Sequence, residues 1–182
     1  MMNNLSPLFR YLGQKIGKRE TIRQISLAIG IPYMTLNRVM KRLEKENLII
    51  TERIGQSVTC SLNIHNPVTK HYLIIASEDS KNQSVKKDSV IKNIAEIISE
   101  KKNFSAVLFG ENQLLLIHEK EESSAEIEEK LSSQNLVLKS FTPSELIESL
   151  KSKDSFAVSL LESHTILNNP EKFWNIIYGV LE

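Results

Sequence analysis

The sequence predicts an α+β protein of two modules: helices closed by a β-hairpin, followed by a segment in which strands and helices alternate. Apolar residues recur at helical spacing in both halves, and short strand-like runs lie between them. Charge is distributed unevenly, since residues 1–70 contain 11 Lys and Arg with 4 Asp and Glu, whereas residues 71–182 contain 12 and 18. We therefore expect a basic domain over residues 1–66, a connecting helix or linker over 67–87, and an acidic α/β domain over 88–182.

Composition excludes several classes of protein. The chain has 182 residues and a formal net charge of +1, and 25% charged residues are ordinary for a folded protein. The longest apolar run, Tyr72–Ala76, is far shorter than the roughly 20 residues that span a bilayer, so no membrane partner is expected. The first residues show no secretion signal, which favours a cytoplasmic location. The single cysteine, Cys60, excludes an intramolecular disulfide and a Cys-rich zinc site.

Two helices are expected before residue 30. The first covers Pro7–Ile16, where apolar residues recur every four positions at Leu8, Leu12 and Ile16. After a break at residues 17–20, Thr21 is a suitable N-cap for a second helix that continues to Ile29. Gly30 ends this helix, because glycine readily adopts the left-handed conformation of a sharp turn.

A third helix and a hairpin follow. Pro32 is expected in the first turn of the helix, which carries an amphipathic stripe of Leu36, Val39, Met40 and Leu43. Asn47 is a tolerable helix terminator, because asparagine accepts positive φ. Residues 48–51 and 58–62 are typical of strands, and Ile54–Ser57, which contains a glycine, is the expected hairpin turn.

The C-terminal module alternates between strand and helix signals, which indicates an α/β or α+β domain. Its strands are expected at residues 104–109, 114–117, 136–141 and 164–167. Its helices are expected at residues 90–98, 123–131, from 143 onward, 155–161 and 170–180. Thr142 and Glu145 form a capping box that opens one of these helices. The closing helix carries four residues suited to a core or a dimer seam: Trp174, Ile177, Tyr178 and Leu181.

The polar side of the third helix suits duplex DNA. A helix-turn-helix places its second helix in the major groove, where the N-terminal residues of that helix reach base edges. Arg38 can bond guanine bidentately, and Asn37 can bond adenine in the same way. The residues expected at base edges are Tyr33, Met34, Thr35, Asn37 and Arg38. Those expected at phosphates or an adjacent groove are Lys41, Arg42, Lys45, Arg53, Gln56 and Ser57. The alternative is that the charged residues form only a solvated helix face.

The run Ile25–Ile49 resembles the winged helix-turn-helix of prokaryotic transcription regulators of the MarR and ArsR type. The shared pattern is a small residue, a turn glycine, a recognition helix ending Lys-Arg-Leu-Glu, and a short link into a Leu-Ile strand. The resemblance covers residues 5–62, with Asn47 in place of the usual glycine. It implies double-stranded DNA as a partner and a role in transcription regulation. A homodimer is expected because one winged helix reads only a half-site. Winged helices also serve as protein-interaction modules, which is an alternative.

The C-terminal module is similar to small nucleotidyltransferase domains, which some archaeal proteins join to a winged helix. Phe104–Gly110 resembles the strand that enters their Gly-Ser motif, and Leu114–Ile117 resembles their next strand. Segments 140–147, 153–161 and 165–167 resemble their C-terminal part. The motif itself is missing, because Glu111 stands in place of the serine and no Asp-x-Asp pair is present for divalent metals. We therefore expect a degenerate fold without enzyme activity, cofactor or metal; nucleotidyltransferase-related activity is the alternative.

Other candidate chemistry is weak. The four histidines, His65, His71, His118 and His164, show no metal-ligand spacing. Cys60 falls in an expected strand without a neighbouring histidine, which favours an inert thiol. The acidic run Glu119–Glu122 is expected to be a solvated surface. The sequence therefore favours a sequence-specific DNA-binding protein whose C-terminal domain dimerises, binds a partner or senses a ligand.

Overall fold

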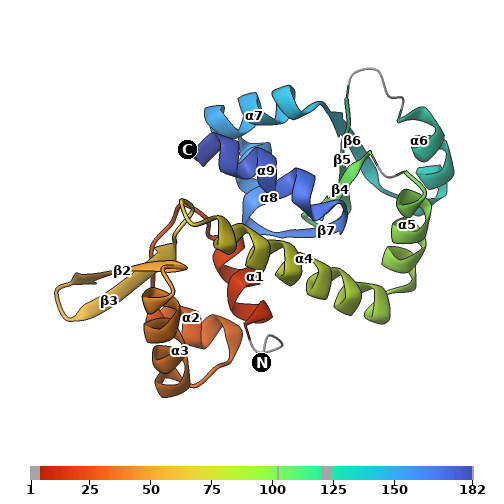
Figure 1. The fold of residues 1–182 in the computed structure, drawn as a ribbon. Helices are drawn as coiled ribbons and strands as arrows, with labels where there is room; N and C mark the ends of the chain where they lie inside the picture. The colour runs from red at the N-terminus through yellow and green to blue at the C-terminus, as the bar shows by residue number, and fades with distance from the viewer. Residues whose placement is uncertain (1–4, 102, 120–123, 182) are drawn as a thin grey trace. The chain divides into compact units, whose positions relative to one another are not determined.

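The computed structural model describes residues 5–101, 103–119 and 124–181 and confirms the mixed α+β class (Figure 1). Two small sheets and the helices around them form two compact units. The first unit runs to Ala76 and also takes in Leu181, and the second runs from Ser77 to Val180. The division between them falls inside one helix, α4 (Pro67–Lys87). No helix among the described residues is both long and apolar enough to cross a membrane.

The first unit contains three consecutive helices and an antiparallel sheet. Its helices are α1 (Ser6–Gln14), α2 (Ile22–Ile29) and α3 (Tyr33–Lys45). Its strands are β1 (Glu20–Thr21), β2 (Ile49–Ile54) and β3 (Ser57–Leu62), in the order β1-β3-β2. The predicted helices and hairpin strands are confirmed, although α1 ends two residues before Ile16. The stretch expected as a break contains β1, which forms only because Glu20 lies opposite Cys60, a residue far along the chain.

The predicted apolar stripes form the core of this unit. Leu36, Met40 and Leu43 of α3 are at most 1% exposed, while Val39 is only half-buried. The other helices contribute further buried side chains: Leu8, Phe9, Leu12, Ile22 and Ile25. Phe9 also stacks on Tyr72 at the start of α4, with ring centroids 4.6 Å apart. The core therefore holds α3 by one side and leaves its other side at the surface.

The polar segment Ser77–Lys87 is helical and forms the second half of α4. Of the two expected possibilities, a linker or a connecting helix, the structure has the helix. Lys and Glu are good helix formers, and Lys81 lies 4.0 Å from Glu78 one turn earlier. Ser77 and Ser80 are buried, and the Ser77 hydroxyl accepts a hydrogen bond of 3.0 Å from the Trp174 indole. The start of this segment therefore packs against the second unit, whereas its last residues, Lys86 and Lys87, are exposed.

The second unit is a four-stranded mixed sheet with helices around it (Figure 1). Its strands are β4 (Ser105–Phe109), β5 (Gln113–Ile117), β6 (Val137–Phe141) and β7 (His164–Asn168), in the order β6-β5-β4-β7. Only β5 and β6 run parallel. Its remaining helices are α5 (Ser89–Ser99), α6 (Ala125–Leu131), η2 (Ser132–Gln134), α7 (Pro143–Ser152), α8 (Ser155–Glu162) and α9 (Pro170–Leu181). The predicted strands are confirmed to within a residue or two, and the expected helix start at Ser123 lies outside the described residues.

Local capping signals in the second unit act as expected. The Thr142 hydroxyl accepts from the Glu145 amide, and the Glu145 carboxylate accepts from the Thr142 amide, so the predicted capping box is confirmed. The helical pattern at 155–161 belongs to a separate helix, α8, because Lys153 adopts positive φ and Asp154 caps a new start. Trp174, Ile177 and Tyr178 are buried within the unit, which favours the core over a dimer seam.

We predict that mild acid destabilises the second unit through His164. Its ring lies beside Phe173 and Trp174, with centroids 5.3 and 5.7 Å away, and its Nδ1 is 3.0 Å from the Leu160 carbonyl oxygen. Burial lowers the pKa of His164 from 6.5 to about 4, so the unfolded chain binds a proton that the folded state excludes. The free energy of unfolding should fall as the pH decreases from about 6.5 to about 4.5, as measured by urea unfolding followed by Trp174 fluorescence.

The variant His164→Gln is the matched control for this pH dependence. Glutamine keeps a polar amide in the site but does not titrate. The difference in free energy of unfolding between wild type and variant should therefore change by about 2 kcal/mol between about pH 6.5 and about pH 4.5. Identical pH dependence in the two proteins would contradict the prediction.

Candidate nucleic-acid interface

The turn between α2 and α3 is fixed by short-range interactions. The Thr21 hydroxyl accepts from the Gln24 amide at 3.2 Å, and the Gln24 side chain accepts from the Thr21 amide at 2.8 Å, so the predicted N-cap is confirmed. Gly30 has a φ of 69°, as predicted for the residue that ends α2. The Ser26 hydroxyl donates to the Ile31 carbonyl at 2.7 Å and closes the turn. Pro32 precedes α3 as its N-cap residue, one position before the expected first turn.

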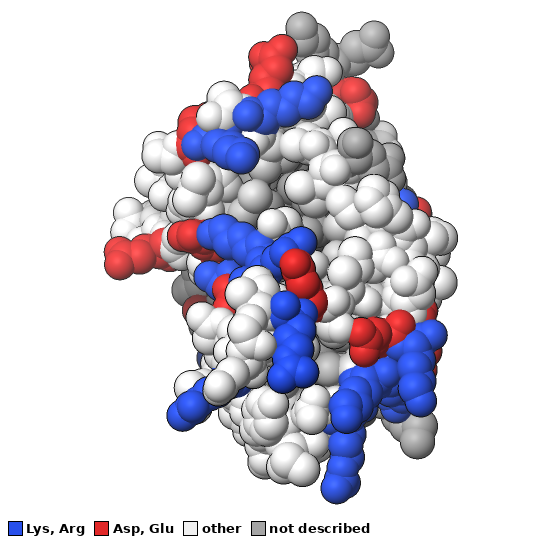
Figure 2. Space-filling view, turned by 90° about the vertical axis from the view of Figure 1, so that its left-hand side faces the viewer, with Lys and Arg blue, Asp and Glu red and all other residues white. Residues whose placement is uncertain are grey.

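The outer side of α3 presents most of the residues that the sequence predicts for the interface. Met34 is 64% exposed and Tyr33 is 47% exposed. The other exposed residues of this side are Thr35, Arg38, Lys41, Arg42 and Lys45. Asn37 is only half-buried. Figure 2 shows Lys and Arg side chains projecting from the surface, with Asp and Glu among them.

Two of the exposed arginines of the first unit form ion pairs with glutamates. Arg42 lies 3.7 Å from Glu46 one turn later, and both side chains are about half exposed. Arg19, before β1, pairs with Glu52 of β2. Exposed pairs of this kind contribute about 0 to 1 kcal/mol and are weakened by salt, so they do not prevent Arg42 from meeting a phosphate.

The hairpin turn is shorter than expected. Ile54 pairs with Ser57, so the loop consists of Gly55 and Gln56 alone. Gly55 has a φ of 62°, a conformation that glycine adopts without strain. The Arg53 Nε donates to the Gly55 carbonyl at 3.2 Å, which holds this side chain along the turn. Arg53, Gln56 and Ser57 are all exposed, as an interface requires.

A hollow of about 530 Å³ brings three elements of the first unit together. It is lined by the start of α2, the start of α3 and the hairpin: Thr21, Ile22, Arg23, Tyr33, Gln56, Ser57 and Val58. Of the predicted interface residues, Tyr33, Gln56 and Ser57 line it, while the other eight lie outside its lining. Lys45 lies at the far end of α3, about 18 Å along the helix axis from Tyr33.

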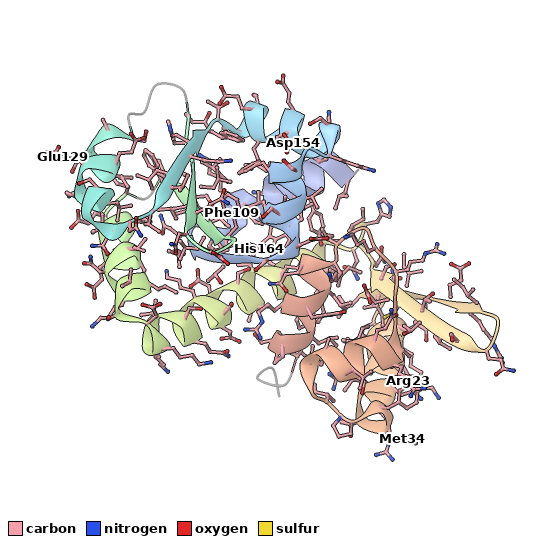
Figure 3. All side chains as sticks on the ribbon, turned by 180° about the vertical axis from the view of Figure 1, so that it is seen from behind. Arg23, Met34, Phe109, Glu129, Asp154 and His164 are labelled. Carbon is pink, nitrogen blue, oxygen red and sulfur yellow. The ribbon has the colours of Figure 1, made fainter. Side chains whose placement is uncertain are left out.

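Sequence reasoning missed Arg23, which is exposed and contributes the cation of this hollow. The sequence did contain a signal for Arg23. Ile22 and Ile25 have the spacing of a buried helix face, and Arg23 falls on the opposite face of the same helix; the structure buries both isoleucines. Figure 3 labels Arg23 and Met34 on the same side of the unit, one on α2 and one on α3.

The end of α3 is held by a cluster of asparagines. Asn47 has a φ of 58°, as predicted for a helix terminator. The Asn63 amide donates to the Asn47 backbone carbonyl at 2.9 Å and to its side-chain oxygen at 3.1 Å. Asn66 donates to the same backbone carbonyl at 2.9 Å. Asn47 therefore ties the end of α3 to the segment between β3 and α4.

The second unit contains a smaller hollow of about 220 Å³ at the β4–β5 turn, near Gly110. Two carboxyl residues, Asp88 and Glu111, and the low-pKa His164 line it. The Asp88 carboxylate is already engaged, since it accepts from the Val90 and Ile91 amides and caps α5. Among the described residues, no Lys or Arg lines this hollow, and no three His, Cys, Asp or Glu side chains are grouped to hold a metal ion.

Comparison with known proteins places the chain in no family. No family model, no curated protein and no solved structure matches it. The function proposed below therefore depends on the residues and geometry of the chain itself.

We predict that Asn63→Ala lowers the free energy of unfolding by about 2 kcal/mol, because Asn63 is 7% exposed and the substitution removes its side-chain hydrogen bonds to Asn47 and to the His65 amide. Urea unfolding measures the change. The exposed His65→Ala is the matched control and should change stability by less than about 0.5 kcal/mol. Equal effects of the two substitutions would contradict the role given to Asn63.

Cys60 should be unreactive in the folded protein. It is 1% exposed, its Sγ lies 3.5 Å from the Glu20 carbonyl oxygen, and burial raises its pKa to about 12. Because only the thiolate is a good nucleophile, an aromatic disulfide reagent at pH 8 should modify Cys60 only after urea unfolds the chain. Rapid modification of Cys60 in the folded protein would contradict this prediction, because it would show that solvent reaches the buried side of β3.

Proposed function

We propose that the protein binds double-stranded DNA through a winged helix-turn-helix in its first unit and acts as a transcriptional regulator. The observation that carries the proposal is the two-sided character of α3. One side is buried by Leu36, Met40 and Leu43, and the other side exposes Arg38 and Lys41. Tyr33, at the start of the helix, lines a hollow that the hairpin also borders. A major groove about 12 Å wide admits one such helix.

The proposal assigns different roles along α3 and around it. Arg38 lies in the first half of the helix, where base edges come within reach, and can bond a guanine through two parallel hydrogen bonds. Lys41, Arg42 and Lys45 lie further along and suit phosphates, which position a protein without specifying sequence. The hollow suits the sugar–phosphate backbone, because it combines the Arg23 guanidinium with the polar side chains of Gln56 and Ser57.

The second unit is proposed to dimerise, bind a partner or sense a ligand. One helix-turn-helix reads a half-site, so a homodimer would contact two half-sites about 34–36 Å apart. Nucleotidyl transfer is the less favoured alternative, because within the described part of the chain the hollow beside Gly110 is lined by two carboxyl residues and by no Lys or Arg to receive phosphates. ATP transfer in the presence of Mg²⁺ would favour that alternative over a purely binding role.

We predict that Arg38→Ala with Lys41→Ala weakens duplex binding at least tenfold at 150 mM salt, because two cations that meet DNA are lost. The slope of log K against log salt concentration should also decrease in magnitude by up to about 2. Fluorescence anisotropy with duplexes selected from genomic DNA by the full-length protein measures both quantities.

The matched control removes two exposed cations from the end of α4, Lys86→Ala with Lys87→Ala. It changes net charge by the same amount and should leave the salt slope within error of the wild type. The proposal fails if the α3 double variant binds the duplex with unchanged affinity and slope. It also fails if both double variants weaken binding equally, because binding would then follow net charge rather than the α3 surface.

A further inference from the structure

Two large apolar side chains are exposed at the start of the otherwise polar side of α3. Met34 is 64% exposed and Tyr33 is 47% exposed. Their neighbours on the outer side, Thr35 and Arg38, are polar and exposed as well. Tyr33 lines the hollow beside the hairpin, whereas Met34 does not. The apolar group that α3 presents outside this hollow is therefore the Met34 side chain (Figure 3).

An exposed apolar group beside cations has a specific counterpart in the major groove. The 5-methyl group of thymine is the apolar feature that base pairs display there. Methionine suits such a contact, because its unbranched thioether adapts its shape to a small apolar partner. A protein partner would instead favour a broader apolar patch, and here Thr35 next to Met34 and Arg38 one turn later are polar and exposed.

Helix geometry relates this contact to the one assigned to Arg38. Residues four apart lie on the same helix face with Cβ atoms about 6 Å apart. Successive base pairs are about 3.4 Å apart along the duplex, so side chains at this spacing suit base pairs one or two steps apart. Met34 and Arg38 thus present one apolar group and one guanidinium group at that spacing.

We propose that Met34 reads a thymine methyl group, so that each half-site contains a thymine within two base pairs of the guanine bonded by Arg38. This inference rests on the proposed DNA-binding function and adds the chemistry of the base that is recognised. It also separates DNA from RNA, because uracil lacks the methyl group.

The test starts from duplexes that the full-length protein selects from genomic DNA. Each thymine of the selected site is replaced in turn by deoxyuridine, which removes one methyl group and keeps the base pair. Replacement at one thymine position, within two base pairs of the essential guanine, should weaken binding about fourfold, from about 0.8 kcal/mol for one buried methyl-sized group. Replacement at other positions should have little effect.

Protein variants connect the methyl group to Met34. Met34→Ala should bind the thymine duplex about fourfold more weakly than the wild type. Its affinity should no longer change when deoxyuridine replaces thymine at the same position. The control is Val68→Ala on α4, an apolar residue that is 48% exposed, which should keep full sensitivity. Thermal melting of each variant establishes that it folds.

The possible outcomes distinguish failure of the Met34 proposal from failure of the proposed DNA-binding function. Tight duplex binding that depends on Arg38 but is unaffected by deoxyuridine overturns the role of Met34 and leaves the DNA-binding proposal standing. Sensitivity to deoxyuridine that persists in Met34→Ala also overturns it. Failure of the wild-type protein to bind any duplex overturns both.

Discussion

Burial of one stripe of α3 determines where the candidate contact residues point. Leu36, Met40 and Leu43 are almost completely buried, and each stabilises the fold by about 2 kcal/mol relative to exposure. With 3.6 residues per turn, fixing these three positions places Met34, Arg38 and Lys45 on the opposite side. The same burial that stabilises the first unit thus creates its basic surface. A rotation of α3 would expose leucine and bury arginine, which is energetically prohibited.

The two ends of α3 are restrained by different means. At its start, the α2 capping box, the left-handed Gly30 and the Ser26 hydrogen bond set the turn that leads into the helix. At its end, Asn63 and Asn66 donate to the backbone carbonyl of Asn47. The base contacts proposed for α3 need side chains held to within fractions of an ångström, and the restraints at both ends of the helix favour such rigidity. The first residues of α4 follow directly from this cluster, so α4 starts from a fixed point.

Sequence reasoning succeeded where signals are local and failed where they are not. Thr21, Gly30 and Thr142 mark helix boundaries through their own chemistry, and the structure places them as expected. The short strand β1 depends on a partner strand about 40 residues away, so its two residues carry no signal. The hollow with Arg23 is likewise set by three segments that only the fold brings together. The order of strands in the second sheet, with β7 beside β4, is equally non-local.

The central claim is that the outer side of α3 and the hairpin meet duplex DNA. Amide chemical-shift mapping of the ¹⁵N-labelled full chain, titrated with a duplex it selects, tests this residue by residue. The account predicts that the largest shifts occur at Tyr33–Lys45, Arg23 and Arg53–Ser57, with residues of the β4–β7 sheet largely unaffected. Shifts that avoid α3, or that concentrate around Gly110 and His164, would contradict it.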